Sequence, residues 1–244
     1  MITPHSKVHT EDQHMPKENG TSRREFIERV TASAVAIGVG SASLAAEASA
    51  AVPLAKPDES WLQGVKGNHA QIFDMPQPQG GFALIKVSNY LDTYKAAYDL
   101  AFPKVVAIVS LWGNTTPLGF NDAMWAKYNF STMTNTLARG TKAPVTRNPF
   151  VTTAAGAETM GLEATVDVPA SATMAALQKR GARFILCNNA FNFWVRRLSA
   201  DGAGDVKAIR SELEQNMVGG VTIVPAMVIA FNRAQEEGAS YMVI

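Results

Sequence analysis

The sequence lacks several features that commonly identify a function. Its 244 residues include one cysteine, so no disulfide can form within the chain. Lys and Arg total 22 and Asp and Glu total 21, and this near balance gives no electrostatic reason to expect nucleic acid or an anionic membrane surface as a partner. The chain also has no Walker-type phosphate loop, no G-x-G-x-x-G motif after a strand and no C-x-x-C pair. These absences exclude the commonest nucleotide-binding and dithiol activities.

The N-terminal segment has the pattern of an export signal. Ser22-Arg23-Arg24-Glu25-Phe26-Ile27 resembles the twin-arginine signature, and the uncharged residues 30–46 lead to a small-x-small site at Ala48-Ser49-Ala50. This uncharged stretch is shorter than the roughly 20 apolar residues of a membrane-spanning helix. We therefore predict a twin-arginine signal peptide over residues 1–50, recognition by the twin-arginine export machinery, and a periplasmic or otherwise exported protein. Retention by an uncleaved signal anchor is the alternative.

Cleavage of this signal would leave few reactive side chains. Three of the four histidines lie ahead of the arginine pair, so the mature chain would keep only His69 and Cys187. One histidine and one cysteine cannot form a zinc site of the usual Cys/His kind, and we expect neither a metal nor an organic cofactor. The remaining length suits one domain with a full hydrophobic core.

Hydrophobic patterning of the mature chain alternates between strands and helices. Residues 51–81 carry scattered Pro and Gly and are predicted to be an extended arm or linker that wraps the domain. Residues 130–168 are predicted to be a long loop or lid. The expected strands cover 82–88, 105–112, 183–187, 221–224 and 241–244. The expected helices cover 91–102, 123–128, 171–180 and 226–237, and helical turns are expected over 195–215 with an interruption at 201–204. This alternation predicts one α/β domain over 82–244, with a parallel sheet of about five strands between helices.

The candidate site lies after two of these strands. Ligands of parallel α/β sheets bind outside the carboxyl ends of the strands, where the loops 113–120 and 187–191 would open together. Cys187 is either a nucleophilic thiolate at a strand end or a small buried residue of the core. The candidate ligand-binding residues are Trp112, Asn114, Thr115, Asp122, Arg147, Asn188 and Asn189.

Several of these residues have an equally simple structural explanation. The loop after Trp112 is either one wall of a pocket or an ordinary turn that leads to the helix capped by Asn121. Asp122 is a general base or an acidic residue favoured in the first turn of that helix. Arg147 either closes over an anionic ligand or lies on the surface, and His69 is a distant candidate partner for Cys187.

Spaced residues in the C-terminal third match a recognisable pattern. They are Leu177-x-x-x-Gly181-Ala182-x-Phe184-x-x-Cys187-Asn188-Asn189, then Gly220-Val221-x-x-Val224-Pro225-Ala226-x-Val228, and finally Gln235-x-x-Gly238-Ala239-x-Tyr241. On these residues the chain resembles the DsrE/DsrF-like family of small sulfur-relay and related α/β proteins. Residues 120–128 and 147–150 are similar to segments of the exported branch of that family.

The resemblance implies a three-layer, flavodoxin-like fold and a homo-oligomer, often built on trimers. In sulfur-relay members a cysteine at the position of Cys187 accepts sulfur as a persulfide and exchanges it with a donor or acceptor protein. If the chain is an enzyme, the resemblance therefore implies sulfur transfer through Cys187. The rival hypothesis is a non-catalytic oligomeric binding or scaffold module in which Cys187 belongs to the core. A hydrolase or lyase that uses Asp122 is a third hypothesis with less support.

Overall fold

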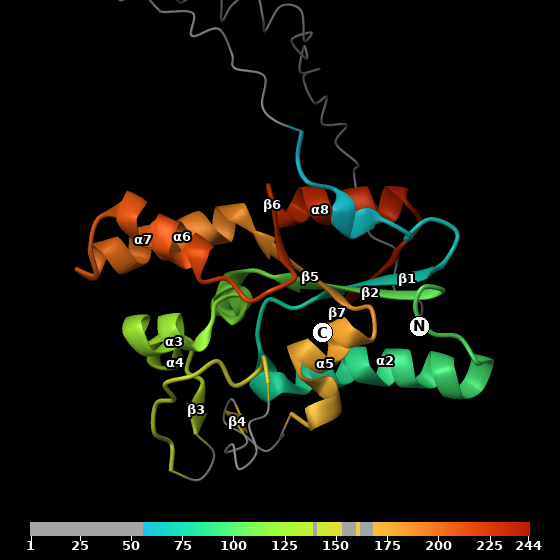
Figure 1. The fold of residues 1–244 in the computed structure, drawn as a ribbon, viewed down its shortest axis with the longest axis horizontal. Helices are drawn as coiled ribbons and strands as arrows, with labels where there is room; N and C mark the ends of the chain where they lie inside the picture. The colour runs from blue at the N-terminus through green and yellow to red at the C-terminus, as the bar shows by residue number, and fades with distance from the viewer. Residues whose placement is uncertain (1–55, 139–140, 153–159, 162–167) are drawn as a thin grey trace, which may run out of the picture. The chain divides into compact units, whose positions relative to one another are not determined.

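The computed structural model describes residues 56–138, 141–152, 160–161 and 168–244 (Figure 1). The predicted signal peptide and the central part of the predicted lid lie outside the described residues. Within the described part of the chain, no helix is long and apolar enough to cross a membrane.

A parallel sheet of five strands forms the centre of the fold, in the order β6-β5-β2-β1-β7. Every neighbouring pair is parallel. The strands are β1 (His69–Asp74), β2 (Val105–Leu111), β5 (Arg183–Cys187), β6 (Val221–Val224) and β7 (Ser240–Val243). Helices cover the sheet on both sides (Figure 1), which confirms the predicted three-layer α/β fold.

The first strand corrects the prediction for residues 51–81. β1 lies in the interior of the sheet, between β2 and β7, so this segment is not an extended arm over its whole length. The sequence pattern does not indicate this strand, because β1 contains His69, Gln71 and Asp74 and is flanked by Pro and Gly. Its burial nevertheless alternates at the start, where Ala70 and Ile72 face the core.

The next segment also differs from its prediction. Residues 82–88 are the first turns of helix α2 (Phe82–Tyr98), not a strand. Ala83, Leu84, Val87 and Leu91 are buried, at the three- and four-residue spacing of a helix that covers a sheet. A short apolar run does not distinguish a strand from a buried helical segment, and here the helical spacing of buried residues extends from Ala83 to Leu91.

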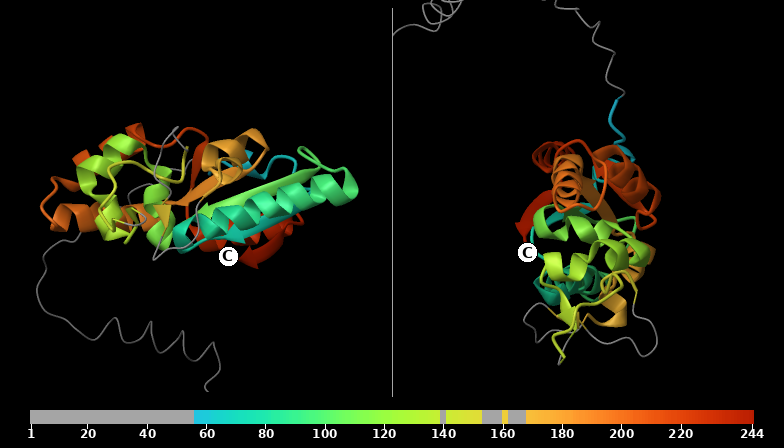
Figure 2. Two further views of the ribbon diagram at one scale, coloured as in Figure 1. Left: turned by 90° about the horizontal axis from the view of Figure 1, so that it is seen from below. Right: turned by 90° about the vertical axis from the view of Figure 1, so that its left-hand side faces the viewer.

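Two hydrophobic clusters, one on each face of the sheet, hold the layers together. Ala107, Val109 and Leu111 of β2 contribute to the first cluster, and the alternate residues Val106 and Ile108 contribute to the second. The first cluster also contains α2, α5 (Met174–Lys179), α6 (Asn188–Ala200) and α7 (Val206–Gln215). The second is closed by the 3-10 turn η1 (Ser60–Leu62) and by α8 (Met227–Glu236). Seen from below, α2 runs lengthwise along its face of the sheet (Figure 2).

The segment between β2 and β5 is mostly helical and irregular. β2 leads into the 3-10 helix η3 (Gly113–Gly119), then α3 (Asp122–Tyr128) and α4 (Phe130–Met133). β3 (Leu137–Ala138) and β4 (Met160–Gly161) form a short antiparallel pair. Two further 3-10 turns, η2 (Gln79–Gly81) and η4 (Ala170–Ala172), precede α2 and α5.

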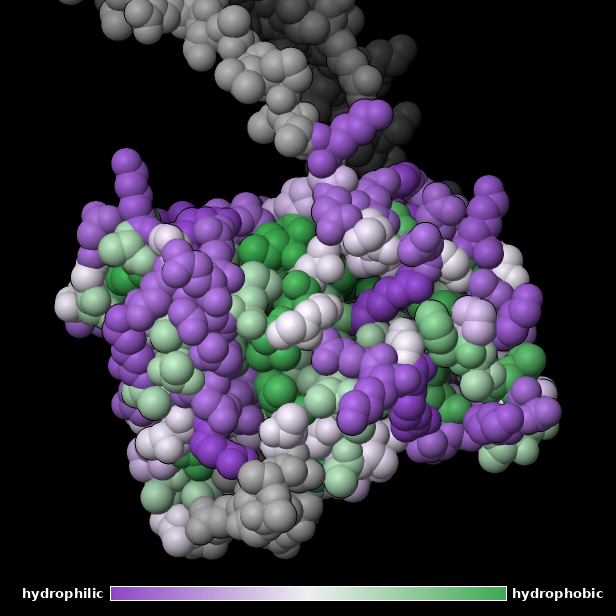
Figure 3. Space-filling model, viewed as in Figure 1, coloured by the Kyte–Doolittle hydropathy of each residue, from purple (hydrophilic) through white to green (hydrophobic). Residues whose placement is uncertain are grey.

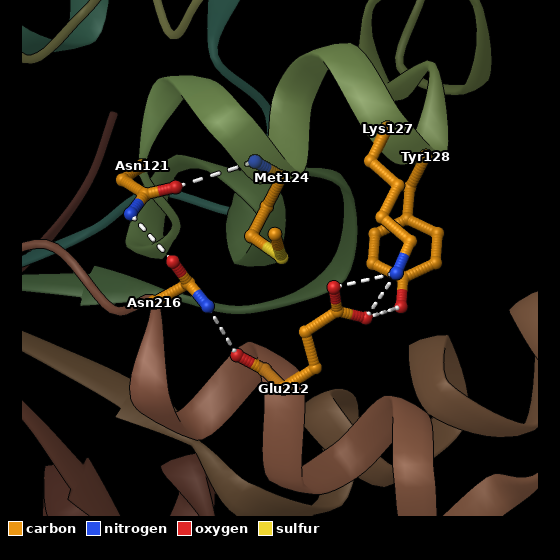
Figure 4. Close-up of polar contacts among 6 residues, drawn as sticks. All are labelled: Asn121, Met124, Lys127, Tyr128, Glu212 and Asn216. Carbon is orange, nitrogen blue, oxygen red and sulfur yellow. Dashed lines mark hydrogen bonds and ion pairs between the residues drawn. The ribbon is translucent and has the colours of Figure 1, made fainter.

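Polar contacts fix α3 against α7 (Figure 4). Asn121 caps α3, as predicted: its side-chain oxygen accepts the Met124 N–H at 3.2 Å, and its amide donates to Asn216 at 3.0 Å. At the other end of α3, Lys127 Nζ lies 2.5 Å from the Glu212 carboxylate, which also accepts the Tyr128 hydroxyl. The bonds from Lys127 and then Tyr128 lower the pKa of Glu212. These contacts assign the α3 segment a structural role.

Candidate functional site

The chain leaves β5 and β6 toward opposite faces of the sheet. α6 begins at Asn188, directly after β5, and packs into the first hydrophobic cluster, whereas α8 follows β6 and packs into the second. Such a divergence leaves a crevice at the carboxyl ends of the strands, where parallel α/β proteins bind ligands. A cavity of about 610 Å³ lies at this position.

Residues from all five strands, or from segments that directly follow them, contribute to this cavity. One wall comes from α6 and another from α8, and the lining is mostly apolar and aromatic. Four residues selected from the sequence meet here: Trp112, Asn114, Cys187 and Asn189. The full lining is Asp74, Trp112, Gly113, Asn114, Cys187, Asn189, Ala190, Phe193, Trp194, Ala226, Met227, Val228, Phe231 and Tyr241.

Cys187 is both a buried residue of the core and a residue that lines the cavity. It is the last residue of β5 and the N-cap of α6, and it belongs to the second hydrophobic cluster with 6% of its surface exposed. It also lines the cavity, where the backbone N–H of Met227 donates to its Sγ at 3.3 Å. The sulfur therefore lies at the beginning of two helices, α6 and α8, and faces a space large enough for a small molecule.

Asp74 is the principal residue of the cavity that the sequence did not reveal. It ends β1, and only 5% of its surface is exposed. Its Oδ1 accepts the Trp112 indole N–H at 2.6 Å and the Ser110 hydroxyl at 3.2 Å, and its Oδ2 accepts the Tyr241 hydroxyl at 2.5 Å. A polar residue at the end of a buried strand indicates a possible site residue. Asp74 fits this pattern only once β1 is known to be a strand.

The Tyr241 hydroxyl is held by this carboxyl group. Its hydroxyl donates to Asp74, and this bond, followed by burial, raises the pKa of Tyr241 to about 12. A neutral tyrosine is favoured because ionisation would break the bond and place two negative charges together. Three neutral donors, Ser110, Trp112 and Tyr241, therefore hold the Asp74 carboxyl group in place.

The loop after β2 forms the rim of the cavity. Asn114 lines the cavity while its side-chain amide donates to Gln77 at 2.9 Å, and the Trp194 indole N–H donates to the Gly113 carbonyl at 2.8 Å. Thr115, in contrast, is fully buried. Its hydroxyl donates to the Met75 carbonyl at 2.5 Å and accepts the Trp112 N–H at 3.0 Å. Thr115 therefore shapes the turn instead of contacting a ligand.

The remaining predicted residues lie away from the cavity. Asn188 accepts a hydrogen bond from Arg210 of α7 at 2.9 Å. Asp122 accepts the Asn148 backbone N–H at 2.9 Å and lines a separate cavity of about 410 Å³. Arg147 is half-buried beside that contact. These partners come from distant parts of the chain, and sequence spacing does not identify them.

The structure also shows where His69 lies and whether the described residues could hold a metal ion. His69 begins β1, so it lies at the end of the strand opposite to Asp74 and cannot act with Cys187. In the described part of the chain, no group of three or more His, Cys, Asp or Glu side chains could hold a metal ion.

Comparisons with known proteins give little beyond this geometry. No family model matches the chain, and no curated protein sequence matches it. Among solved structures, the chain is similar to a protein of unknown function from Methanobacterium thermoautotrophicum. The two share 15% identity with a TM-score of 0.35, and the match covers 72% of this chain and 100% of the other. The resemblance to the DsrE/DsrF-like family therefore stays a prediction.

Proposed function

We propose that this chain is an exported DsrE-like protein that accepts sulfane sulfur on Cys187 from a small donor bound in the cavity. The observation that carries the proposal is the position of the only cysteine. It lies at the carboxyl end of a central strand, lines a cavity of about 610 Å³, and receives the Met227 N–H on its sulfur.

The proposed reaction is a thiol exchange without net oxidation. The Cys187 thiolate attacks the terminal sulfur of a persulfide donor R–S–SH. The Sγ–S bond forms while the donor's S–S bond breaks, and the R–S⁻ thiolate leaves with the electron pair of that bond. The product is Cys187–S–SH, and a second thiol, from an acceptor protein or small molecule, regenerates the cysteine by the reverse exchange.

The surroundings of Cys187 suit this chemistry. The N–H donated by Met227 and the adjoining starts of α6 and α8 stabilise negative charge on sulfur. The side chain of Asn189, at the cavity wall, supplies a hydrogen-bonding group for the bound donor.

Export is the second component of the proposal. The twin-arginine pathway transports folded proteins, and a single-cysteine carrier without cofactor would meet that requirement by folding or assembling before transport. Replacing both Arg23 and Arg24 by Lys should retain the protein in the cytoplasm in cell fractionation, whereas replacing Lys7 and Lys17 by Arg should leave export unchanged. Export of the double Lys variant at the wild-type level would contradict the assignment.

Native thiol labelling distinguishes this function from a core role for Cys187. Because the chain has one cysteine, a maleimide label has a single target. We expect labelling of the folded protein, slowed by Val228→Trp, which narrows the cavity, but not by Ile229→Trp on the neighbouring residue. Val228 lines the cavity and Ile229 does not, although both are exposed, at 73% and 54%. Labelling only after unfolding would exclude the carrier function.

The apolar surface favours a second candidate, a homo-oligomeric binding or scaffold module. Met242 and Val243 on the edge strand β7 are exposed, as are Val228 and Ile229 on α8. Apolar side chains also gather on the face at the other edge of the sheet, beside the polar surface of α6 and α7 (Figure 3). Edge strands with exposed apolar residues tend to pair with another chain, and a second copy is the proposed occupant.

Sedimentation tests the oligomer. Wild type should sediment as an oligomer, and Val243→Asp should dissociate it. Val206→Asp, at an exposed valine of α7, should not. A monomeric wild type would exclude this module. If Cys187 is also unreactive in the folded oligomer, the scaffold role is supported over the carrier role.

A further inference from the structure

We propose that the cavity binds a small organic cation, with the Asp74 carboxylate as its counter-ion. This inference names the ligand class of the cavity and rests on the proposed function only in treating the cavity as the ligand site. In the proposed reaction, the sulfur donor is then an amine-bearing molecule and not an anion such as thiosulfate.

The Asp74 carboxyl group is paired with no cationic side chain of the described chain. Its carboxylate oxygens receive hydrogen bonds from Ser110, Trp112 and Tyr241, all neutral donors, and no Lys, Arg or His of the described residues forms an ion pair with it. A buried charge is normally paired with an opposite charge or a metal. The three donors offset part of the desolvation of this carboxylate, and a cationic ligand would offset more.

The walls of the cavity also favour a cation. Five aromatic residues line it: Trp112, Phe193, Trp194, Phe231 and Tyr241. The negative face of an aromatic ring attracts an ammonium group, and this attraction is strongest when both are shielded from water. The Trp112 indole is fixed to Asp74 by its N–H, and the Tyr241 ring by its hydroxyl, so two of these rings adjoin the carboxylate.

The same features disfavour other ligands. An anion would enter a cavity that contains a buried carboxylate and is lined, within the described chain, by no Lys, Arg or His. A neutral molecule would fill the apolar volume but leave the carboxylate without a counter-ion. A volume of about 610 Å³ admits a molecule with one aromatic or short aliphatic body and one ammonium group.

Three matched probes test the ligand class by calorimetry with the full-length chain: 2-phenylethylammonium, the neutral alcohol 2-phenylethanol and the anion phenylacetate. We expect the ammonium to bind on the order of tenfold more tightly than the alcohol, and the anion to bind most weakly. Equal binding of ammonium and alcohol, tighter binding of phenylacetate, or no binding of the ammonium would overturn the proposal.

Variants of cavity residues test whether the preference for the ammonium arises in this cavity. Asp74→Asn should abolish the preference for the ammonium and leave binding of the alcohol unchanged. Phe231→Leu, which keeps the Asp74 carboxyl group, should weaken binding of the ammonium more than binding of the alcohol. It provides a second test if Asp74→Asn does not fold. An unchanged ratio in either folded variant contradicts the proposal. Cys187→Ser should keep the preference, so that a failure of sulfur transfer and a failure of cation binding are observed separately.

Discussion

The hydrogen bond from Tyr241 to Asp74 provides a titration that reports the charge of the buried carboxyl group. The two oxygens lie 2.5 Å apart, and the pKa of Tyr241 rises from 10.0 to about 12. This shift lowers the ratio of tyrosinate to tyrosine about a hundredfold at a given pH. The bond to Asp74 is its largest cause and burial the second. Replacing Asp74 by Asn removes the negative charge, so we expect the pKa of Tyr241 to fall most of the way back.

Ultraviolet tyrosinate absorbance across an alkaline titration measures this change. Subtracting the curve of Tyr241→Phe from that of wild type isolates Tyr241 from Tyr90 and Tyr128, whose pKa values are also raised. The same subtraction in the Asp74→Asn background gives the shifted value. Because the folded pKa is the higher one, the stabilising contribution is complete below pH 10.0 and is lost as the pH rises through about 12. An identical Tyr241 titration with Asn at position 74 would refute the hydrogen bond to Asp74 as the cause of the shift.

Three further substitutions and one control substitution test the packing and electrostatics of the fold by denaturant unfolding. Gly181→Ala should lower the free energy of unfolding by about 2 kcal/mol, because Gly181 has φ 91° and a Cβ would come within 2.2 Å of a phenylalanine ring. Gly202→Ala, at φ 85° with no atom within 4 Å, should show the smaller backbone effect alone, and equal losses would exclude the contact. Thr116→Val should raise the free energy of unfolding by about 1 kcal/mol, since the buried hydroxyl has no hydrogen-bond partner among the described residues; a loss of stability would reveal one. Glu212→Gln should lose less stability than wild type on acidification, because the bond from Lys127 lowers the Glu212 pKa below 4.5, and its contribution, present above pH 4.5, disappears as the pH falls through the folded value; parallel pH profiles would contradict this.

The sequence predicts four of the five strands. β2 and β5 lie where apolar, often β-branched, runs indicate them, because burial removes the need for polar residues. Short apolar runs also indicate the two edge strands, β6 and β7. The sequence pattern does not predict β1, because this strand carries polar residues and lies between Pro- and Gly-containing segments. The pattern predicts a strand at the start of α2, because a short apolar run has no distinguishing period.

The residues of the cavity likewise include some that the sequence predicts and one, Asp74, that it does not. Trp112, Asn114, Cys187 and Asn189 follow strands that the sequence identifies, and all four line the cavity. The position of Asp74 in the cavity could not be predicted, because the sequence pattern does not indicate β1. The donors that hydrogen-bond to Asp74 come from β2, from the loop after it and from β7. Partners that far apart in sequence are set by the order of strands in the sheet, which local patterns do not encode.

The sulfur-carrier proposal is tested most directly by the intact mass of the folded protein after incubation with the persulfide of cysteamine, an amine-bearing R–S–SH donor. We predict a gain equal to one sulfur atom, removed by a thiol reductant and absent from Cys187→Ser. No gain in the folded protein, together with a reactive cysteine in the unfolded chain, would contradict the proposal and assign Cys187 to the core.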